Sequence, residues 1–241
     1  MCPQLEAPAE GSRSRSPYAS APRLPQGEAL DLQQVLGASP SRDAALASGL
    51  ELEIGPGRGS FLLERLAVGP EVRIVGLEIR LKWASLVDQR LHELGLAERG
   101  RVFAEDIRQA LPRFATGSLS RVFVHFPDPW WKKKHAKRRL ANGAVVTEIA
   151  RLLRGAGELF VQTDVWETAE AYRDAIESHP AFEPLGDAPG SALVVDNPYG
   201  ARSPRERRVM ADDLPVTRLR YRRRAVADND LQHRDLQDRV A

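Results

Sequence analysis

Residues 50–59 read LELEIGPGRG, a short apolar-rich run that leads directly into three glycines. The run predicts a strand, and residues 60–67 (SFLLERLA) have the spacing of a helix. Glycines between a strand and a helix, here Gly55, Gly57 and Gly59, let the backbone turn tightly and approach a ligand without a Cβ clash. The turn therefore predicts a ligand-binding strand end, with a purely structural turn as the alternative.

The rest of the chain alternates between predicted strands and helices. Further strands are predicted at 72–79, 101–106, 121–126 and 157–164, and helices at 81–96, 144–154 and 166–178. This alternation is typical of an α/β protein with a parallel sheet and helices on both faces. Ligands of such folds bind beyond the carboxyl ends of the strands, near the point where the strand order reverses.

The composition is that of a single globular domain with tails. The chain has 241 residues, of which 42% are hydrophobic and 28% are charged. We expect a disordered tail at 1–35, a domain at 36–226 and a polar tail at 227–241. No apolar stretch is long enough to span a bilayer, so no membrane partner is expected. The single cysteine, Cys2, excludes an internal disulfide and favours a cytoplasmic location.

Positive charge is concentrated in two segments, although the formal net charge is only +2. Residues 132–139 (KKKHAKRR) hold six lysines and arginines without an acid, and residues 202–224 hold nine arginines. Dense basic segments on a nearly neutral protein indicate localised sites for a polyanion. We therefore expect both segments to bind phosphates.

Acidic residues follow the second and third predicted strands. Glu78 lies about 20 residues beyond the glycines, where a carboxylate can accept both hydroxyls of a ribose. Asp106 could accept a hydrogen bond from an adenine amino group, or it could cap the helix that starts at IRQAL. A solvent-exposed acid is the alternative for Glu78. Together with the glycine turn, these acids predict a pocket for an adenosine-bearing cofactor and resemble class I S-adenosylmethionine-dependent methyltransferases.

The fourth predicted strand runs into FPDPWWKKKHAKRR, residues 126–139. Pro127 fixes its own φ, and Pro129 disfavours a helical conformation at Asp128. Asp128 is therefore held extended at the rim of the expected pocket, which would aim its carboxylate; a rigid turn with an incidental acid is the alternative. Trp130 and Trp131 could stack on nucleobases or pack against the core.

This stretch, together with LEIGPGRG and GLEI, resembles the signature of the bacterial tRNA (guanine-N7-)-methyltransferase family. The similarity runs from about Leu50 to Arg224. The resemblance implies a Rossmann-like class I methyltransferase with a mostly parallel seven-stranded sheet. It also implies S-adenosyl-L-methionine as cofactor and a guanine in the variable loop of tRNA as substrate.

The resemblance assigns roles to individual residues. It implies cofactor contacts at Glu53, Glu78, Asp106 and Asp128, and Asp128 matches the residue that is assigned as catalytic. Substrate contacts are implied at Lys132, Lys134, His135, Lys137, Arg138, Arg139 and Asp164. A late T-x-x-E motif of the family corresponds to Ser203-Pro204-Arg205-Glu206, where serine replaces threonine, so Ser203 and Glu206 are further candidates for substrate contacts.

The chemistry implied by the resemblance requires alignment rather than proton removal. Guanine N7 carries an exposed lone pair and needs no deprotonation before it attacks a sulfonium methyl group. We expect Asp128 to orient the base or to stabilise the developing positive charge. No metal is required, and the sequence has no His/Cys cluster that would hold one.

Three alternatives remain open from the sequence. The first is a methyltransferase that acts on a protein or a small molecule, and the second is a non-enzymatic RNA-binding protein on the same fold. The third is an NAD-dependent oxidoreductase, which the G-x-G-x-G spacing disfavours because the dinucleotide fingerprint is G-x-G-x-x-G. We expect a monomer or a homodimer.

Overall fold

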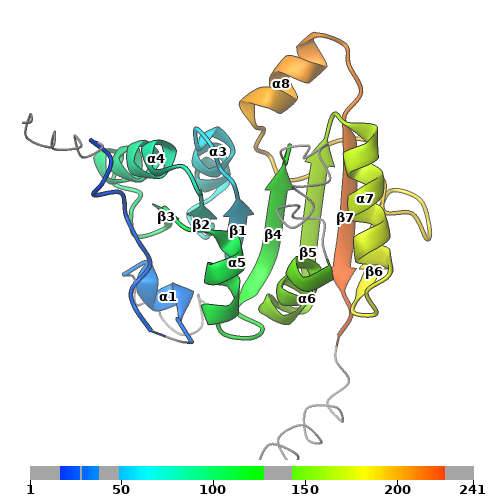
Figure 1. Ribbon diagram of the computed structural model, residues 1–241. Coiled ribbons are helices and arrows are strands. Elements are labelled where there is room, and N and C mark those ends of the chain that lie inside the picture. The colour runs from blue at the N-terminus through cyan, green and yellow to red at the C-terminus, as the bar shows by residue number, and fades with distance from the viewer. Residues whose placement is uncertain (1–16, 28, 38–48, 128–142, 226–241) are drawn as a thin grey trace, which may run out of the picture.

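A computed structural model describes residues 17–27, 29–37, 49–127 and 143–225 (Figure 1). Its centre is one seven-stranded sheet with the strand order β3-β2-β1-β4-β5-β7-β6. The strands are β1 (Leu50–Ile54), β2 (Arg73–Leu77), β3 (Gly100–Phe103), β4 (Leu119–His125), β5 (Leu153–Thr163), β6 (Phe182–Pro184) and β7 (Thr217–Arg223). The order reverses between β1 and β4, which is where a ligand is expected to bind.

The sheet is mostly parallel, as predicted. Strands β1 to β5 are parallel to one another, and β7 is antiparallel to both of its neighbours, β5 and β6. Every residue of β1 is buried, including Glu51 and Glu53. Two carboxylates on a fully covered strand require partners inside the protein, and these partners help to define the site.

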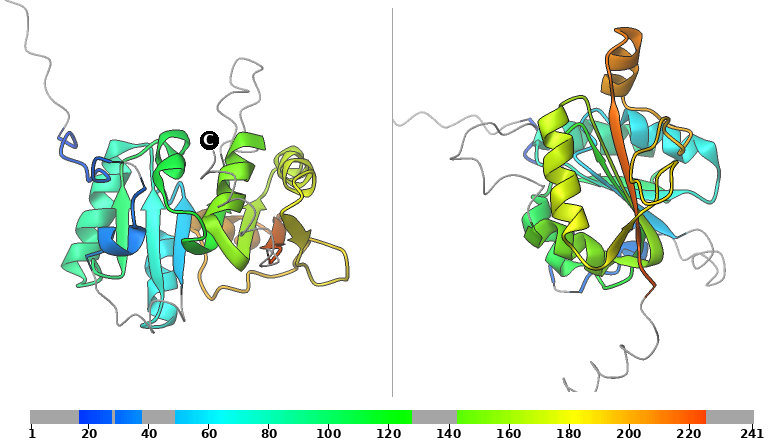
Figure 2. Two further views of the ribbon diagram at one scale, coloured as in Figure 1. Left: turned by 90° about the horizontal axis from the view of Figure 1, so that it is seen from below. Right: turned by 90° about the vertical axis from the view of Figure 1, so that its right-hand side faces the viewer.

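The helices cover both faces of the sheet (Figure 2). Helices α1, α5, α6 and α7 pack on one face together with a short 3₁₀ turn, and α3 and α4 pack on the other. The bounds are α1 (Leu32–Val35), α3 (Ser60–Val68), α4 (Leu81–Glu93), α5 (Ile107–Ala110), η1 (Leu111–Arg113), α6 (Gly143–Leu152), α7 (Trp166–Glu177) and α8 (Pro204–Ala211).

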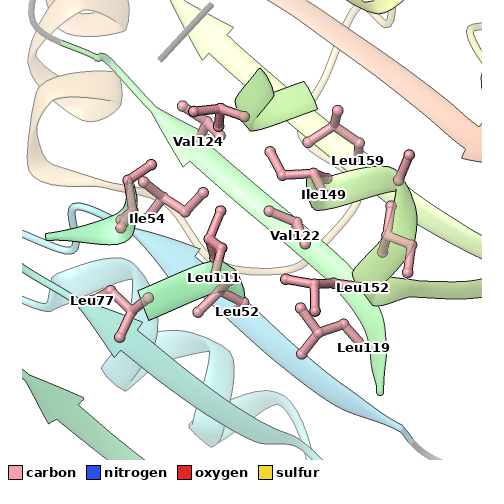
Figure 3. Close-up of a cluster of buried hydrophobic side chains, with 14 of the residues drawn as sticks. Leu52, Ile54, Leu77, Leu111, Leu119, Val122, Val124, Ile149, Leu152 and Leu159 are labelled. Atoms are coloured by element: carbon pink, nitrogen blue, oxygen red, sulfur yellow. The ribbon is translucent and has the colours of Figure 1, made fainter. Parts of the chain in front are cut away.

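The larger hydrophobic core lies between the sheet and the helices α5, α6 and α7. Figure 3 shows the part of it that joins Leu52 of β1 and Val122 of β4 to Ile149 of α6. These side chains are almost entirely excluded from solvent. The parallel strands therefore appear in the sequence as nearly continuous apolar runs.

The amino-terminal segment differs from the prediction of a disordered tail that ends at residue 35. Residues 17–27 and 29–37 lie against the domain, and Leu24 and Leu32 belong to the larger core. Ala104 N–H donates to the carbonyl of Pro22 at 2.7 Å, so the segment runs alongside the loop after β3. The amino-acid composition did not indicate this packing, because only a few apolar side chains of the segment contact the core. Residues 1–16 and 226–241 lie outside the described residues.

The sequence pattern did not predict the helix and the strands that follow residue 178. Helix α8 lies beyond the carboxyl ends of β4 and β5, and β7 then inserts between β5 and β6 (Figure 1). Ser203 is the N-cap residue of α8, and its Oγ accepts the backbone N–H of Glu206 at 3.1 Å. Pro204 at the first helical position supports this start. The Ser203-Pro204-Arg205-Glu206 motif is thus the amino-terminal cap of a helix.

Two kinds of feature are absent from the part of the chain that the structure describes. No helix there is long and apolar enough to cross a membrane. No group of three or more His, Cys, Asp or Glu side chains there could hold a metal ion.

Candidate active site

A cavity of about 600 Å³ opens at the carboxyl ends of four adjacent parallel strands. Its walls are the residues that follow β1, β2, β3 and β4, namely 54–55, 77–80, 105–108 and 125–127. This volume is typical of a site for a nucleoside-sized ligand. The cavity lies at the reversal of the strand order, as the sequence predicted.

The glycine turn forms one wall of the cavity. Gly55, Gly57 and Gly59 all have positive φ values of 72°, 56° and 73°, which other residues rarely adopt. Gly55 lines the cavity directly. Gly59 instead allows close packing of α3 on α4, because a Cβ there would lie 2.4 Å from Val87 Cγ1. Of the three glycines expected to bind the cofactor, only Gly55 belongs to the cavity wall.

Glu78 lines the cavity and connects two of its loops. Its side chain is buried, and its Oε2 accepts the backbone N–H of Gly57 at 2.9 Å. Its Oε1 accepts the backbone N–H of Arg80 at 2.9 Å and Arg80 Nε at 3.0 Å. The carboxylate is therefore fixed in place, which excludes the alternative of a solvated surface acid.

Asp106 caps a helix, which is one of the two alternatives that the sequence left open, and it also lines the cavity. Its Oδ1 caps α5 by accepting the backbone N–H of Arg108 at 3.0 Å. The side-chain hydrogen bond from Arg108 lowers the pKa of Asp106 below its usual value. Asp106 therefore remains a carboxylate at neutral pH, and such a group only accepts hydrogen bonds.

Glu53 forms a buried pair with His125. Glu53 Oε1 lies 3.0 Å from His125 Nδ1, and both side chains are 3% exposed. The two residues are joined by the parallel pairing of β1 with β4, which places Glu53 opposite Phe123. His125 lines the cavity, so the pair connects the buried acid to the site.

The chain leaves β4 through a strained turn. Phe126 has a φ of 45°, an uncommon value for a bulky residue and especially for one before a proline. Its N–H donates to the carbonyl of Gln162 at 2.8 Å, which ties the turn to β5. Pro127 is the last described residue of this segment and lines the cavity. The FPDPWW motif therefore starts at the cavity rim.

Comparison with known proteins gives the family. A family model described as "Putative methyltransferase" matches residues 48–219. A tRNA (guanine-N(7)-)-methyltransferase of Synechococcus sp. (strain JA-3-3Ab) is 37% identical over 179 residues, which cover 74% of this chain and 74% of that protein. One of Myxococcus xanthus (strain DK1622) is 38% identical over 175 residues, or 71% of this chain and 82% of that protein. The chain belongs to the tRNA (guanine-N(7)-)-methyltransferase family.

Membership in this family confirms the resemblance that the sequence motifs indicated. It also confirms the class I methyltransferase fold with seven strands. The solved structure of the [4+2]-cyclase SpnF is similar, with a TM-score of 0.51 over 81% of each chain at 16% identity, and this likeness concerns the fold alone. The family assignment sets aside an NAD-dependent oxidoreductase.

Several residues that the family motif implicates cannot be placed. Asp128, Lys132, Lys134, His135, Lys137, Arg138 and Arg139 lie outside the described residues. Their roles remain predictions from the motif. Pro127 shows where the segment that carries them leaves the described part of the site.

Asp164 follows β5 and lies outside the cavity wall. Arg205 of α8 donates to Asp164 Oδ2 from Nη2 at 2.9 Å and from Nε at 3.2 Å. The Cζ atom of Arg205 is also 5.7 Å from the centre of the Phe126 ring. The structure therefore brings the expected substrate residue of β5 close to the strained turn after β4. Sequence reasoning did not single out Arg205, because its partner is 41 residues away.

Glu206, a candidate for substrate contact, is completely buried in this structure. Its Oε1 accepts Arg218 Nη2 at 2.9 Å, and its Oε2 accepts Gln162 Nε2 and Asn197 Nδ2, each at 3.1 Å. These bonds join α8 to β5, β7 and the loop before α8. Ser203 caps the helix, so Ser203 and Glu206 both hold the start of α8, and neither lines the cavity.

The second basic segment, at 202–224, differs from the expected phosphate-binding surface. Eight of its nine arginines form ion pairs with carboxylates of this chain. The partners come from distant positions, among them Glu64, Glu158 and Glu183. The ninth, Arg223, donates from Nε to the carbonyl of Ala150. Most of these arginines are therefore paired with acids of the same chain, although several side chains stay exposed, among them that of Arg208 at 85%. The expectation for phosphate binding falls mainly on 132–139.

Proposed function

We propose that the protein transfers a methyl group from S-adenosylmethionine to N7 of a guanine in the variable loop of tRNA. The observation that carries the proposal is family membership, with 37% identity to a tRNA (guanine-N(7)-)-methyltransferase over 74% of both chains. A cavity with acids at successive strand ends is the kind of site that this reaction needs. The proposal favours this reaction over methyl transfer to a protein or a small molecule.

The described residues fit the cofactor chemically. Glu78 and Asp106 are fixed acceptors in the cavity wall, suited to the ribose hydroxyls and to the adenine amino group. Glu53 has a buried Oε2 without a hydrogen-bond partner among the described residues, suited to an ammonium group. S-adenosylmethionine, when bound, supplies a methyl group on a positively charged sulfur.

The remaining task of the protein is to hold the guanine in line with the methyl group. The N7 lone pair attacks without a general base, so orientation carries most of the effect, and orientation can contribute about 7–11 kcal/mol. We assign this role to Asp128, which follows Pro127 at the cavity rim. Asp164 is the second candidate for contact with the guanine, and Arg205 fixes its carboxylate.

The lysines and arginines of residues 132–139 are proposed to bind the phosphates around the target base. Release of counterions from these phosphates favours binding and makes it sensitive to salt. Partial unstacking of a base in folded tRNA costs a few kcal/mol, and these contacts offset that cost. Lys132, Lys134 and His135 follow the acid by four, six and seven positions, so one short segment would serve both roles.

Mass spectrometry of nucleosides from unmodified tRNA, incubated with the protein and S-adenosylmethionine, tests the proposal. The expected product is 7-methylguanosine, and fragment mapping should place it in the variable loop. Asp128→Ala should abolish turnover with little loss of tRNA affinity, whereas Asp174→Ala, a change of an exposed acid on α7, should retain turnover. Label that enters protein or small molecules but not tRNA would refute the proposal.

A further inference from the structure

We propose that His125 is a positioning residue for the cofactor: its Nδ1–H holds Glu53 so that Glu53 Oε2 binds the protonated amino group of the methionine moiety. The inference rests on the proposed function, because it concerns how the same site recognises its methyl donor. Neither the glycine turn nor the FPDPWW motif includes His125, which comes immediately before that motif.

The geometry fixes which nitrogen of the ring carries the proton. His125 Nδ1 lies 3.0 Å from Glu53 Oε1, and a carboxylate can only accept a hydrogen bond. Nδ1 is therefore the donor. The bond crosses from β4 to β1 and is buried, since both side chains are 3% exposed. A buried bond of this kind holds the carboxylate in one orientation.

The second oxygen of Glu53 lacks a donor in the part of the chain that the structure describes. Oε2 is buried and has no hydrogen-bond partner among the described residues. A buried carboxylate with a single donor is costly, so its position implies that another donor arrives with a ligand. Ile54 and Gly55, the next two residues, line the cavity, and so does His125. Glu53 is not itself one of the wall residues, but its chain neighbours and its hydrogen-bond partner are, so its carboxylate lies directly behind the cavity wall.

The nearby cations of the fold are already engaged. Arg65 donates to Glu51 from Nε and Nη2, each at 2.8 Å, and Arg121 Nη1 donates to the same carboxylate at 2.8 Å. Glu51 and Glu53 are two residues apart on β1, so their side chains share one face of the sheet. Both arginines are therefore engaged by Glu51, and the donor that the structure shows for Glu53 is His125 Nδ1.

Aromatic side chains hold the His125 ring in place. Its centre lies 4.1 Å from that of Phe61, 5.8 Å from that of Phe123 and 6.0 Å from that of Phe160. His125 Nε2 is buried and has no hydrogen-bond partner among the described residues. Among the described residues, the hydrogen bond that the ring makes is the one from Nδ1, and substitution can separate this bond from the aromatic packing.

Three substitutions separate the donor from the packing. His125→Asn places an amide N–H near the position of Nδ1, and His125→Gln places one near the position of Nε2 instead. His125→Phe fills the aromatic cluster without any donor. His92→Gln, a change of a half-exposed histidine on α4, is the control for histidine replacement as such.

Calorimetry with two ligands gives the decisive measurement. S-adenosylhomocysteine carries the amino group within its amino-acid moiety, and 5′-methylthioadenosine is the same thioether nucleoside without that moiety, so it lacks both the amino and the carboxylate group. We expect His125→Gln and His125→Phe to weaken S-adenosylhomocysteine binding about tenfold or more, with 5′-methylthioadenosine binding changed less than about twofold. His125→Asn should bind S-adenosylhomocysteine within about threefold of wild type. His92→Gln should not differ from wild type.

The outcomes distinguish this inference from the proposed function. Normal S-adenosylhomocysteine binding by His125→Gln would overturn the inference, and so would equal losses for both ligands, because the latter would indicate a distorted cavity. If His125→Gln does not fold, the S-adenosylhomocysteine affinities of His125→Phe and His125→Asn are compared in its place. Wild-type protein that binds S-adenosylhomocysteine but forms no 7-methylguanosine would refute the proposed function and leave the role of His125 to the binding data.

Discussion

Arg205 Nη2 lies 2.9 Å from Asp164 Oδ2, so α8 is joined to the residue that follows β5. The same guanidinium covers the ring of Phe126, whose φ of 45° begins the turn into the FPDPWW motif. One arginine thus connects the ends of two adjacent strands and a helix that arrives 41 residues later. The cap at Ser203 starts α8 at Pro204 and so places Arg205 in the first turn of the helix.

Arg205→Ala should lower kcat/KM for tRNA about tenfold, because Asp164 and Phe126 lose the group that fixes them. Arg208→Ala is the matched control. It removes the same charge from the same helix, but the Arg208 side chain is 85% exposed and its acidic partner is 3.9 Å away. Steady-state methylation of tRNA measures both variants. Equal losses would indicate that α8 acts through charge alone.

Lys134→Ala combined with Arg138→Ala should weaken tRNA binding and reduce the slope of log K against log salt by about 1 to 2. The control is Arg202→Ala with Arg222→Ala, which removes two cations that ion pairs with Asp196 and Glu183 already neutralise. This pair should leave the slope nearly unchanged. Filter binding at several salt concentrations measures the slope for both double variants. A larger change of slope for the control pair than for the Lys134 and Arg138 pair would indicate that residues 202–224 bind phosphates after all.

Glu206→Ala should reduce the free energy of unfolding by about 3–5 kcal/mol, because it leaves Arg218 buried without its acid. Glu206→Gln should cost less, since an amide can still accept hydrogen bonds from Gln162 and Asn197. Ser203→Ala removes only the helix cap and should cost about 1 kcal/mol. Urea denaturation ranks the three variants. An unchanged midpoint for Glu206→Ala would contradict the buried network.

Gly59→Ala should be more destabilising than Gly55→Ala, although both residues have nearly the same φ. A left-handed alanine costs about 1–2 kcal/mol at either position. Only at Gly59 does the added Cβ clash, at 2.4 Å from Val87 Cγ1, because nothing lies within 4 Å of a Cβ at Gly55. Val87→Ala should therefore partly rescue Gly59→Ala in a double-mutant cycle of unfolding free energies. Simple additivity would exclude the clash.

Asp106→Asn should destabilise the protein at neutral pH, and the difference should shrink as the pH falls below the unfolded pKa. The side-chain hydrogen bond from Arg108 lowers the pKa of Asp106 in the folded state. The carboxylate therefore stabilises the fold above its unfolded pKa of about 3.9, and this contribution is lost as the pH falls through the folded value. Urea midpoints at about pH 7 and about pH 3 test the sign. Asparagine still caps the helix, so a difference that does not shrink in acid would not come from the charge.

The sequence alone determined the features that depend on neighbouring residues. Alternating apolar runs and helical spacing predicted the parallel strands β1 to β5 and the helices between them, because such elements are buried on a fixed period. Three glycines predicted the turn after β1, since only glycine tolerates three positive φ values within five residues. The FPDPWW motif indicated the family, which the comparisons confirmed.

The tertiary structure alone decided which charges meet. The nine arginines of 202–224 look like a cationic surface in the sequence, yet their partners lie on elements as distant as α3, with Glu64, and β5, with Glu158. His125 and Glu53 are 72 residues apart and become a pair only when β4 lies beside β1. An ion pair or a buried hydrogen bond depends on distance in space, which local spacing does not encode. The sequence therefore located the site, and the fold determined which of its charges remain available to a ligand.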